Sequence, residues 1–141
     1  MVEKALGKNY FEKGKLPIHV ARVNRALGES HDHDLTEILH YHDFTEIIII
    51  LRGSSLHLVE GNEYMVSAGD VFGLQGFQSH SFKDASNVEI VNVMFDSKEI
   101  PKLLDSSIFR KIPGYNALFI LEPHYRNKHH FRNILHLSRK E

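Results

Sequence analysis

The chain has 141 residues, of which 42% are hydrophobic and 25% are charged, a balance typical of one folded domain rather than a disordered chain. Its formal net charge of -1 argues against nucleic-acid binding through bulk electrostatics, because domains that bind in this way usually carry a basic excess. The absence of cysteine excludes a disulfide framework and a thiolate site.

The amino-terminal residues favour a protein that is neither exported nor membrane-bound. Residues 1–16 are polar and contain no apolar segment of the kind found in signal peptides, so we predict an arm with little regular structure. The longest apolar run, Ile47–Leu51, has the length of a strand and is far too short to cross a bilayer. A cytoplasmic protein without membrane contacts is therefore expected.

Short β-strand patterns follow one another through residues 17–97. Residues 17–23 alternate and are rich in β-branched side chains, which predicts the first strand. Six more predicted strands follow at even spacing, separated mostly by turns that contain glycine: 46–51, 55–59, 63–66, 71–74, 80–82 and 88–95. Short strands spaced in this way predict a mainly β fold, either a sandwich or a barrel.

Residues 98–141 are predicted to form a short helical and irregular extension. Residues 97–109 suggest a helix that is broken near Pro101, and Pro-Gly and Glu-Pro pairs interrupt the stretch that follows. The last four residues, Ser138 to Glu141, form a Ser-x-x-Glu capping box, which is typical of the start of a helix. Two explanations remain open: a frayed charged tail, or a longer chain that continues into a linker helix.

A group of potential metal ligands recurs with the period of a strand. His40, His42 and Glu46 are separated by even numbers of residues, so one extended strand would place all three on one face, which Ile48 and Ile50 would continue. His80, on a later predicted strand, can approach them if the sheet closes. Three imidazoles and a carboxylate suit a divalent transition metal such as zinc, nickel, iron or manganese. The alternative is that these side chains line the barrel and hydrogen-bond one another or water.

Other side chains are candidates for a ligand site. His57 alternates with two leucines, so it faces either the cavity or solvent. Asn92 interrupts an apolar strand and is either a pocket hydrogen-bonding group or a structurally satisfied one. Four aromatic residues could stack on a sugar or belong to the ordinary core: Phe44, Phe72, Phe77 and Phe82. His31 and His33 in SHDHD form another His-x-His pair, for which a solvated acidic turn is the alternative to a surface metal site.

The ligand pattern resembles the two-part motif of cupins. His40-x-His42-x3-Glu46-x6-Gly53 matches the later part of the first cupin motif, and the residues from Gly69 to His80 have the spacing of the second. The resemblance implies a cupin-type barrel of the double-stranded β-helix or jelly-roll kind. All four ligand positions are kept, whereas four turn positions of the family's pattern hold other residues: Asp34, Gln75, Phe77 and Asp84.

A longer resemblance covers residues 40–96 and also the tail from Pro113. These stretches are similar to the amino-terminal sensing domain of AraC-type transcription regulators, of which the rhamnose-regulator branch is the nearest. The resemblance implies a homodimer that binds a small effector, expected to be a sugar, in the barrel and requires no metal. DNA would be bound only through a helical linker and a DNA-binding unit outside this chain. The residues expected to contact the effector are His40, His42, Glu46, His57, His80, Phe82 and Asn92.

Two other functions remain open at this point. One is a stand-alone metal-dependent cupin enzyme, a sugar isomerase, epimerase or dioxygenase, in which the metal acts as a Lewis acid or activates oxygen. The other is an oligomeric barrel that binds no small ligand. No catalytic residue is assigned under the sensing-domain interpretation.

Overall fold

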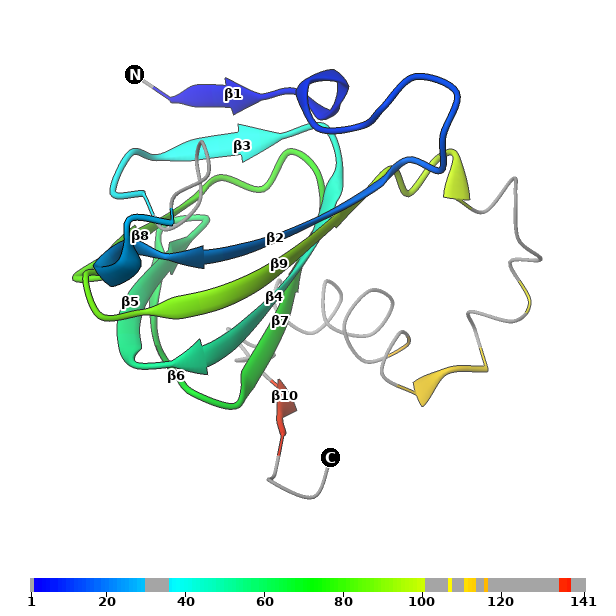
Figure 1. Cartoon of the computed structure of the whole chain (residues 1–141). Coiled ribbons are helices and arrows are strands. Elements are labelled where there is room, and N and C mark those ends of the chain that lie inside the picture. The colour runs from blue at the N-terminus through cyan, green and yellow to red at the C-terminus, as the bar shows by residue number, and fades with distance from the viewer. Residues whose placement is uncertain are drawn as a thin grey trace.

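The computed structural model describes residues 2–29, 36–100, 107, 111–113, 116 and 135–137. Its described strands form two five-stranded sheets that face each other across an apolar core, in the orders β1-β3-β8-β5-β6 and β10-β7-β4-β9-β2 (Figure 1). The elements are β1 (Glu3–Ala5), the 3-10 turn η1 (Gly7–Asn9), β2 (Ile18–Asn24), η2 (Arg25–Leu27), β3 (His40–His42), β4 (Thr45–Arg52), β5 (Ser54–Val59), β6 (Asn62–Ser67), β7 (Asp70–Leu74), β8 (His80–Lys83), β9 (Glu89–Phe95) and β10 (Leu135–His136).

Consecutive strands from β3 to β9 alternate between the two sheets, except for the β5–β6 hairpin. Such alternation is a feature of double-sheet jelly rolls, the architecture to which cupins belong. The predicted mainly β, cupin-type fold is confirmed. Each of the seven strands predicted between residues 17 and 95 is present, with ends that differ by one residue at most.

The central strand β4 shows why these residues form this fold. Its isoleucines are β-branched, which suits a pleated surface packed on both sides. Ile48 and Ile50 point between the sheets and are fully buried, while Ile47 and Ile49 alternate onto the other face and are half-buried. Because β4 pairs with β7 on one side and β9 on the other, it is the central strand of its sheet.

The β5–β6 hairpin is closed by a two-residue turn, Glu60-Gly61. Both residues have positive φ, 49° for Glu60 and 80° for Gly61. A type I′ turn requires this backbone conformation, and its twist matches that of the two strands. The turn therefore sets the register that places His57 opposite Tyr64, and the pairing of β5 with β8 places Phe82 on the other side of His57.

Two expectations from the sequence are corrected by the structure. The stretch from His40 to Ile50 is two strands in different sheets, because the chain bends at Asp43 and Phe44 and β4 pairs with β9 rather than with β8. The amino-terminal arm is also more ordered than predicted. Glu3–Ala5 pairs in parallel with β3, and the Gly7 N–H donates to Asp43 Oδ1 at 2.7 Å. Both differences come from long-range pairing, which local sequence patterns do not report.

Most of the predicted extension, residues 98–141, lies outside the described residues, as do most of the predicted helix at 97–109 and the capping box at the end of the chain. Its described part includes β10, which pairs antiparallel with β7 and so completes one edge of the second sheet. Across the residues that the structure describes, no helix has the length and apolar character needed to span a lipid bilayer.

Candidate functional site

The bend at Asp43 and Phe44 brings His42 and Glu46 face to face. His42 ends β3 in one sheet, Glu46 lies near the start of β4 in the other, and both side chains are buried. His42 Nε2 lies 3.3 Å from Glu46 Oε2. The predicted proximity of these two residues is therefore present, although it results from a change of sheet and not from a shared strand face.

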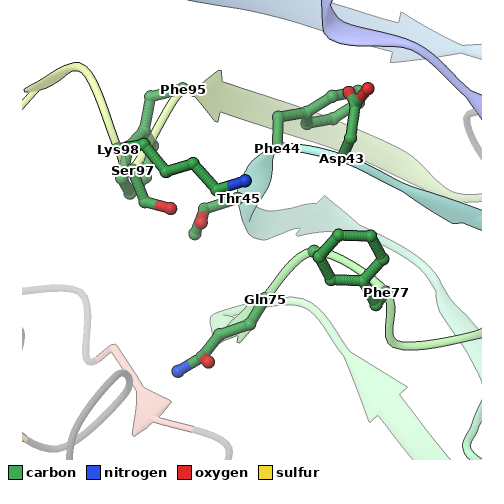
Figure 2. Close-up of a pocket in the computed structure, with 9 residues that line it drawn as sticks. Asp43, Phe44, Thr45, Gln75, Phe77, Phe95, Ser97 and Lys98 are labelled. Atoms are coloured by element: carbon green, nitrogen blue, oxygen red, sulfur yellow. The ribbon is translucent and has the colours of Figure 1, made fainter.

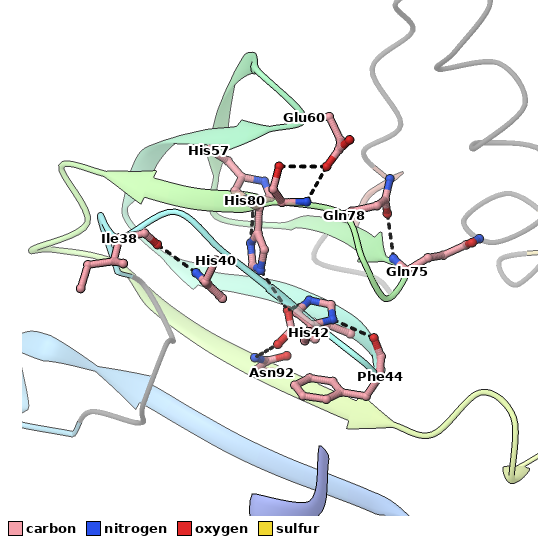
Figure 3. A network of polar contacts seen from close by, with 12 residues as sticks. Ile38, His40, His42, Phe44, His57, Glu60, Gln75, Gln78, His80 and Asn92 are labelled. Carbon is pink, nitrogen blue, oxygen red and sulfur yellow. Dashed lines mark hydrogen bonds and ion pairs between the residues drawn. The ribbon is translucent and has the colours of Figure 1, made fainter. Parts of the chain in front are cut away.

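His80 reaches the same carboxylate from β8. It pairs across the sheet with His40, and its Nε2 lies 3.7 Å from Glu46 Oε2 (Figure 3). One ligand atom each from His42, Glu46 and His80 lies within 4.8 Å of the other two. His40 is outside this three-residue set, but its ring centroid is only 4.2 Å from that of His80.

Backbone carbonyls determine the tautomers of two of the histidines. His42 Nδ1 lies 2.7 Å from the Phe44 carbonyl oxygen, and His40 Nδ1 lies 3.0 Å from that of Ile38. A carbonyl oxygen can only accept, so Nδ1 carries the proton in both rings and Nε2 of a neutral ring holds a lone pair. Histidines that bind metals are usually oriented in this way by a group beyond the metal.

The aromatic ring of Phe44 supports His42 from one side. The two rings are stacked, with centroids 4.5 Å apart and planes 15° apart. The rings of Tyr10 and Phe11, in the amino-terminal arm, also pack edge-on against the Phe44 ring, at centroid distances of 5.5 and 5.9 Å. The arm therefore contributes to the packing that holds the His42 ring in place.

Asn92 and His57 complete the surroundings of these ligands. Asn92 Nδ2 donates to Glu46 Oε1 at 3.2 Å, so the polar side chain in this apolar strand has a hydrogen-bond partner. His57 points inward, is only 2% exposed, and places Nε2 3.3 Å from His80 Nδ1. Phe82 is buried in the main core and stacks on His57. We call the group formed by His40, His42, Glu46, His57, His80 and Asn92 the buried polar cluster.

Burial and mutual charge shift the pKa values in this cluster. Burial opposes a charged imidazole at His42, but contact with the Glu46 carboxylate and its negative charge outweigh it, so the pKa of His42 lies above its ordinary 6.5. Burial alone would raise the pKa of Glu46, yet contacts with His42 and Asn92 lower it below 4.5. Burial and the neighbouring imidazoles of His40, His57 and His42 hold the pKa of His80 well below 6.5.

The three facing atoms fit a cation. Among the described residues, none of His42 Nε2, Glu46 Oε2 and His80 Nε2 has a hydrogen-bond partner, and all three are buried. A neutral His42 would direct its Nε2 lone pair at a negative carboxylate oxygen, and this contact is favourable only if a proton or a metal ion lies between them. Imidazole nitrogen and carboxylate oxygen are suitable ligands for zinc and other first-row metals.

A surface cavity of about 340 Å³ opens beside the bend. We call it the bend pocket; it is lined by Asp43, Phe44, Thr45, Gln75, Gly76, Phe77, Phe95, Ser97 and Lys98 (Figure 2). Phe77 is 66% exposed and has a positive φ of 75°, an unusual conformation for a bulky residue. A second cavity, of about 420 Å³, lies near Arg52 and Glu89. Neither of these two cavities is lined by the buried polar cluster.

From the sequence, Phe44 and Phe77 are candidate rings for stacking on a sugar, but the bend pocket that they line is not predicted. Its lining residues lie in three loops that are distant in the chain, so no local pattern joins them. One signal was available: Gln75 and Phe77 are two of the positions at which the sequence departs from the cupin pattern. The second predicted pair, His31 and His33, lies outside the described residues.

Comparison with known proteins gives one family match. A family model described as the AraC-like ligand binding domain matches residues 23–141. The helix-turn-helix-type transcriptional activator RhaR of Escherichia coli strain K12 is 31% identical over 87 residues, which make up 62% of this chain and 30% of the relative. RhaR of Shigella flexneri serotype 5b is 30% identical over the same share of each chain. The chain thus spans about 30% of the length of these relatives.

Solved structures with local similarity include two β proteins. A predicted oxalate decarboxylase from Thermotoga maritima is 32% identical, with a TM-score of 0.38 over 40% of this chain and 52% of that one. A cupin protein from Bacteroides fragilis is 15% identical, with a TM-score of 0.43 over 57% of this chain and 64% of that one.

Proposed function

The chain belongs to the family of AraC-like ligand binding domains, and on this basis we propose that it senses a small-molecule effector on behalf of a transcription regulator. Its relatives are named as helix-turn-helix transcriptional activators and are longer than this chain, so DNA binding would be the task of another part of such a regulator. A regulator of this type works as a homodimer in the cytoplasm in our proposal. The effector that we propose is a carbohydrate.

The bend pocket supports a polar effector of sugar size. A volume of about 340 Å³ is in the range of small-molecule sites. Hydroxyl, carboxamide, carboxylate and ammonium groups line it at Thr45, Gln75, Asp43 and Lys98, and these groups suit the donors and acceptors of a polyol. Phe77 adds an exposed ring on which the apolar face of a sugar can stack.

The buried polar cluster supports the capture of a divalent transition metal in the interior. His42, Glu46 and His80 would hold the ion, with His40 next to them. When bound, the metal would balance the negative charge of the buried Glu46 carboxylate and accept the lone pairs of the two facing imidazole nitrogens. Phe44 connects the two sites, because it is one of the residues that line the bend pocket and its carbonyl oxygen accepts from His42. Effector and metal are therefore expected to influence each other's affinity.

The observation that carries the metal part is the burial of three ligand atoms without hydrogen-bond partners among the described residues. The experiment is a thermal-unfolding titration of protein freed of metal with a chelator and purified without a His-tag. Zn²⁺, Ni²⁺ and Mn²⁺ are added singly, followed by a panel of monosaccharides. We expect one metal and one sugar class to raise Tm. No shift with any sugar, with or without metal, would contradict carbohydrate sensing, and no shift with any metal would contradict metal capture.

A metal-dependent enzyme remains the second candidate, because three protein ligands leave positions open, as catalytic metal sites do. Turnover of a sugar or of oxygen by the metal-loaded protein would establish it. Binding of a sugar without turnover, unaffected by chelator, would instead support a sensor that needs no metal.

A further inference from the structure

His57 occupies a position between the metal ligands and the apolar core. It lies in the middle of β5 and is buried, with Nε2 3.3 Å from His80 Nδ1. Its ring packs against two phenyl rings. The centroid of Phe82 is 4.3 Å away at an interplanar angle of 15°, and the centroid of Phe72 is 4.5 Å away at 37°. These contacts restrict the buried ring, whose Nε2 is directed at His80.

We propose that His57 is a positioning residue that holds His80 in the tautomer able to bind a metal. His80 faces Glu46 Oε2 through Nε2, so this nitrogen must hold a lone pair if it is to be a ligand. The proton of a neutral His80 must then reside on Nδ1 and be donated to His57 Nε2. His57 must accept this hydrogen bond, with its own proton on Nδ1. The inference rests on the metal capture proposed above.

His57 differs from the backbone carbonyls that contact His40 and His42. A carbonyl oxygen only accepts a hydrogen bond, so a neutral His40 or His42 has a single tautomer, with its proton on Nδ1. His80 instead contacts a second imidazole, and such a pair can be hydrogen-bonded in either direction. In the reverse direction His57 Nε2–H donates to His80 Nδ1, and the His80 proton lies on Nε2, toward Glu46.

Metal binding would therefore select one direction of this pair. Before binding, both rings carry their proton on Nε2; after binding, both carry it on Nδ1. In this change the shared proton moves from His57 Nε2 to His80 Nδ1, the proton on His80 Nε2 leaves to solvent, and His57 Nδ1 takes up one proton from solvent. The pair therefore holds two protons before and after, and both rings are neutral in each state. Because the His57 ring packs against the buried rings of Phe72 and Phe82, we expect the exchange to change proton positions without side-chain movement.

The test compares two variants of His57. His57→Phe keeps an aromatic ring in contact with Phe72 and Phe82 but removes the acceptor, whereas His57→Gln keeps an acceptor oxygen. Zn²⁺ binding to the metal-freed protein is measured by titration calorimetry. Loss of an outer-shell partner typically weakens metal binding by about 10–100-fold. We expect a loss of that size for His57→Phe and partial recovery for His57→Gln, with similar Tm values for both variants in chelator.

The tautomers are read directly from long-range proton–nitrogen NMR correlations of the imidazole rings in wild-type protein with and without Zn²⁺. We expect His80 to carry its proton on Nδ1 in the zinc-bound form. A zinc-bound His80 protonated on Nε2, or equal zinc affinity in wild type and His57→Phe, would overturn the role of His57. Failure of the wild type itself to bind any metal would instead overturn the metal capture. The wild-type NMR measurement remains decisive if either variant fails to fold.

Discussion

The substitution Glu46→Gln distinguishes a metal ligand from a structural carboxylate. Gln keeps the shape of the side chain and an oxygen for the Asn92 Nδ2 donor, which lies 3.2 Å from Glu46 Oε1. It removes the negative charge that faces His42 and His80. At pH 8 His42 can become neutral in the variant, so no uncompensated buried charge remains. We therefore expect the metal-free variant to unfold within about 1.5 kcal/mol of the wild type.

The metal response should change far more. A metal at a hundred times its Kd stabilises the folded wild type by about 2.7 kcal/mol. For a chain of 141 residues this corresponds to a Tm increase of roughly 9 °C, from about 2.1 cal/mol/K of unfolding entropy per residue. A carboxamide oxygen is a weaker ligand than a carboxylate. If affinity falls about a hundredfold, the same metal concentration yields only about 0.4 kcal/mol and a shift of 1–2 °C, roughly.

The assay is thermal unfolding at pH 8 with chelator and with Zn²⁺, for wild type and variant in parallel. Glu89→Gln is the matched control, because Glu89 is also a buried carboxylate but contacts Arg22 and Asn24 away from the histidines. It should keep the full zinc response whatever it does to stability. An equal zinc response in wild type and Glu46→Gln would refute the assignment of Glu46 as a ligand. A loss of several kcal/mol in chelator with an unchanged zinc response would make its role structural.

Two further predictions concern pH and the attachment of β10. The pKa of His42 lies above 6.5, and a metal binds only the neutral imidazole. Zinc affinity should therefore fall as pH is lowered from 8 toward 6. Calorimetric titrations at the two pH values check this, and equal affinities would contradict it. Gly69→Ala should cost about 1–2 kcal/mol for its positive φ and should also displace β10, because a Cβ there would lie 2.9 Å from the His136 ring and 3.0 Å from the Leu137 carbonyl oxygen. Gly61→Ala has the same backbone strain but open space around it. Only Gly69→Ala should therefore lose hydrogen-exchange protection at the Leu137 N–H, which donates to Gly69 O; equal protection in the two variants would contradict the proposed displacement.

Local patterns were sufficient to predict most of the strands. Buried and less buried side chains alternate in β4, β5 and β9, because successive side chains of a strand point to opposite faces of the sheet. This two-residue period is visible in the order of residue types along the chain. The spacing of His40, His42, Glu46 and His80 was likewise sufficient to identify side chains that the fold brings together.

The way in which they meet was decided by tertiary structure alone. The turn at Asp43 and Phe44 places β3 and β4 in different sheets. The residue types at the bend do not predict this, because its cause is the pairing of β4 with β7 and β9. The inward direction of His57 was also open in the sequence, since alternation identifies two faces of a strand but not which one is buried.

The mainly β fold, the positions of its central strands and the candidate ligand side chains were predictable from the sequence, because all three depend on side-chain type and period along the chain. The three-dimensional packing was needed to show which of these side chains meet at one point, that a carbonyl at Phe44 and an imidazole at His57 contact two of them, and that a pocket opens beside the bend. Those features depend on contacts between strands that are distant in the sequence, and such contacts are determined by the packing of the two sheets.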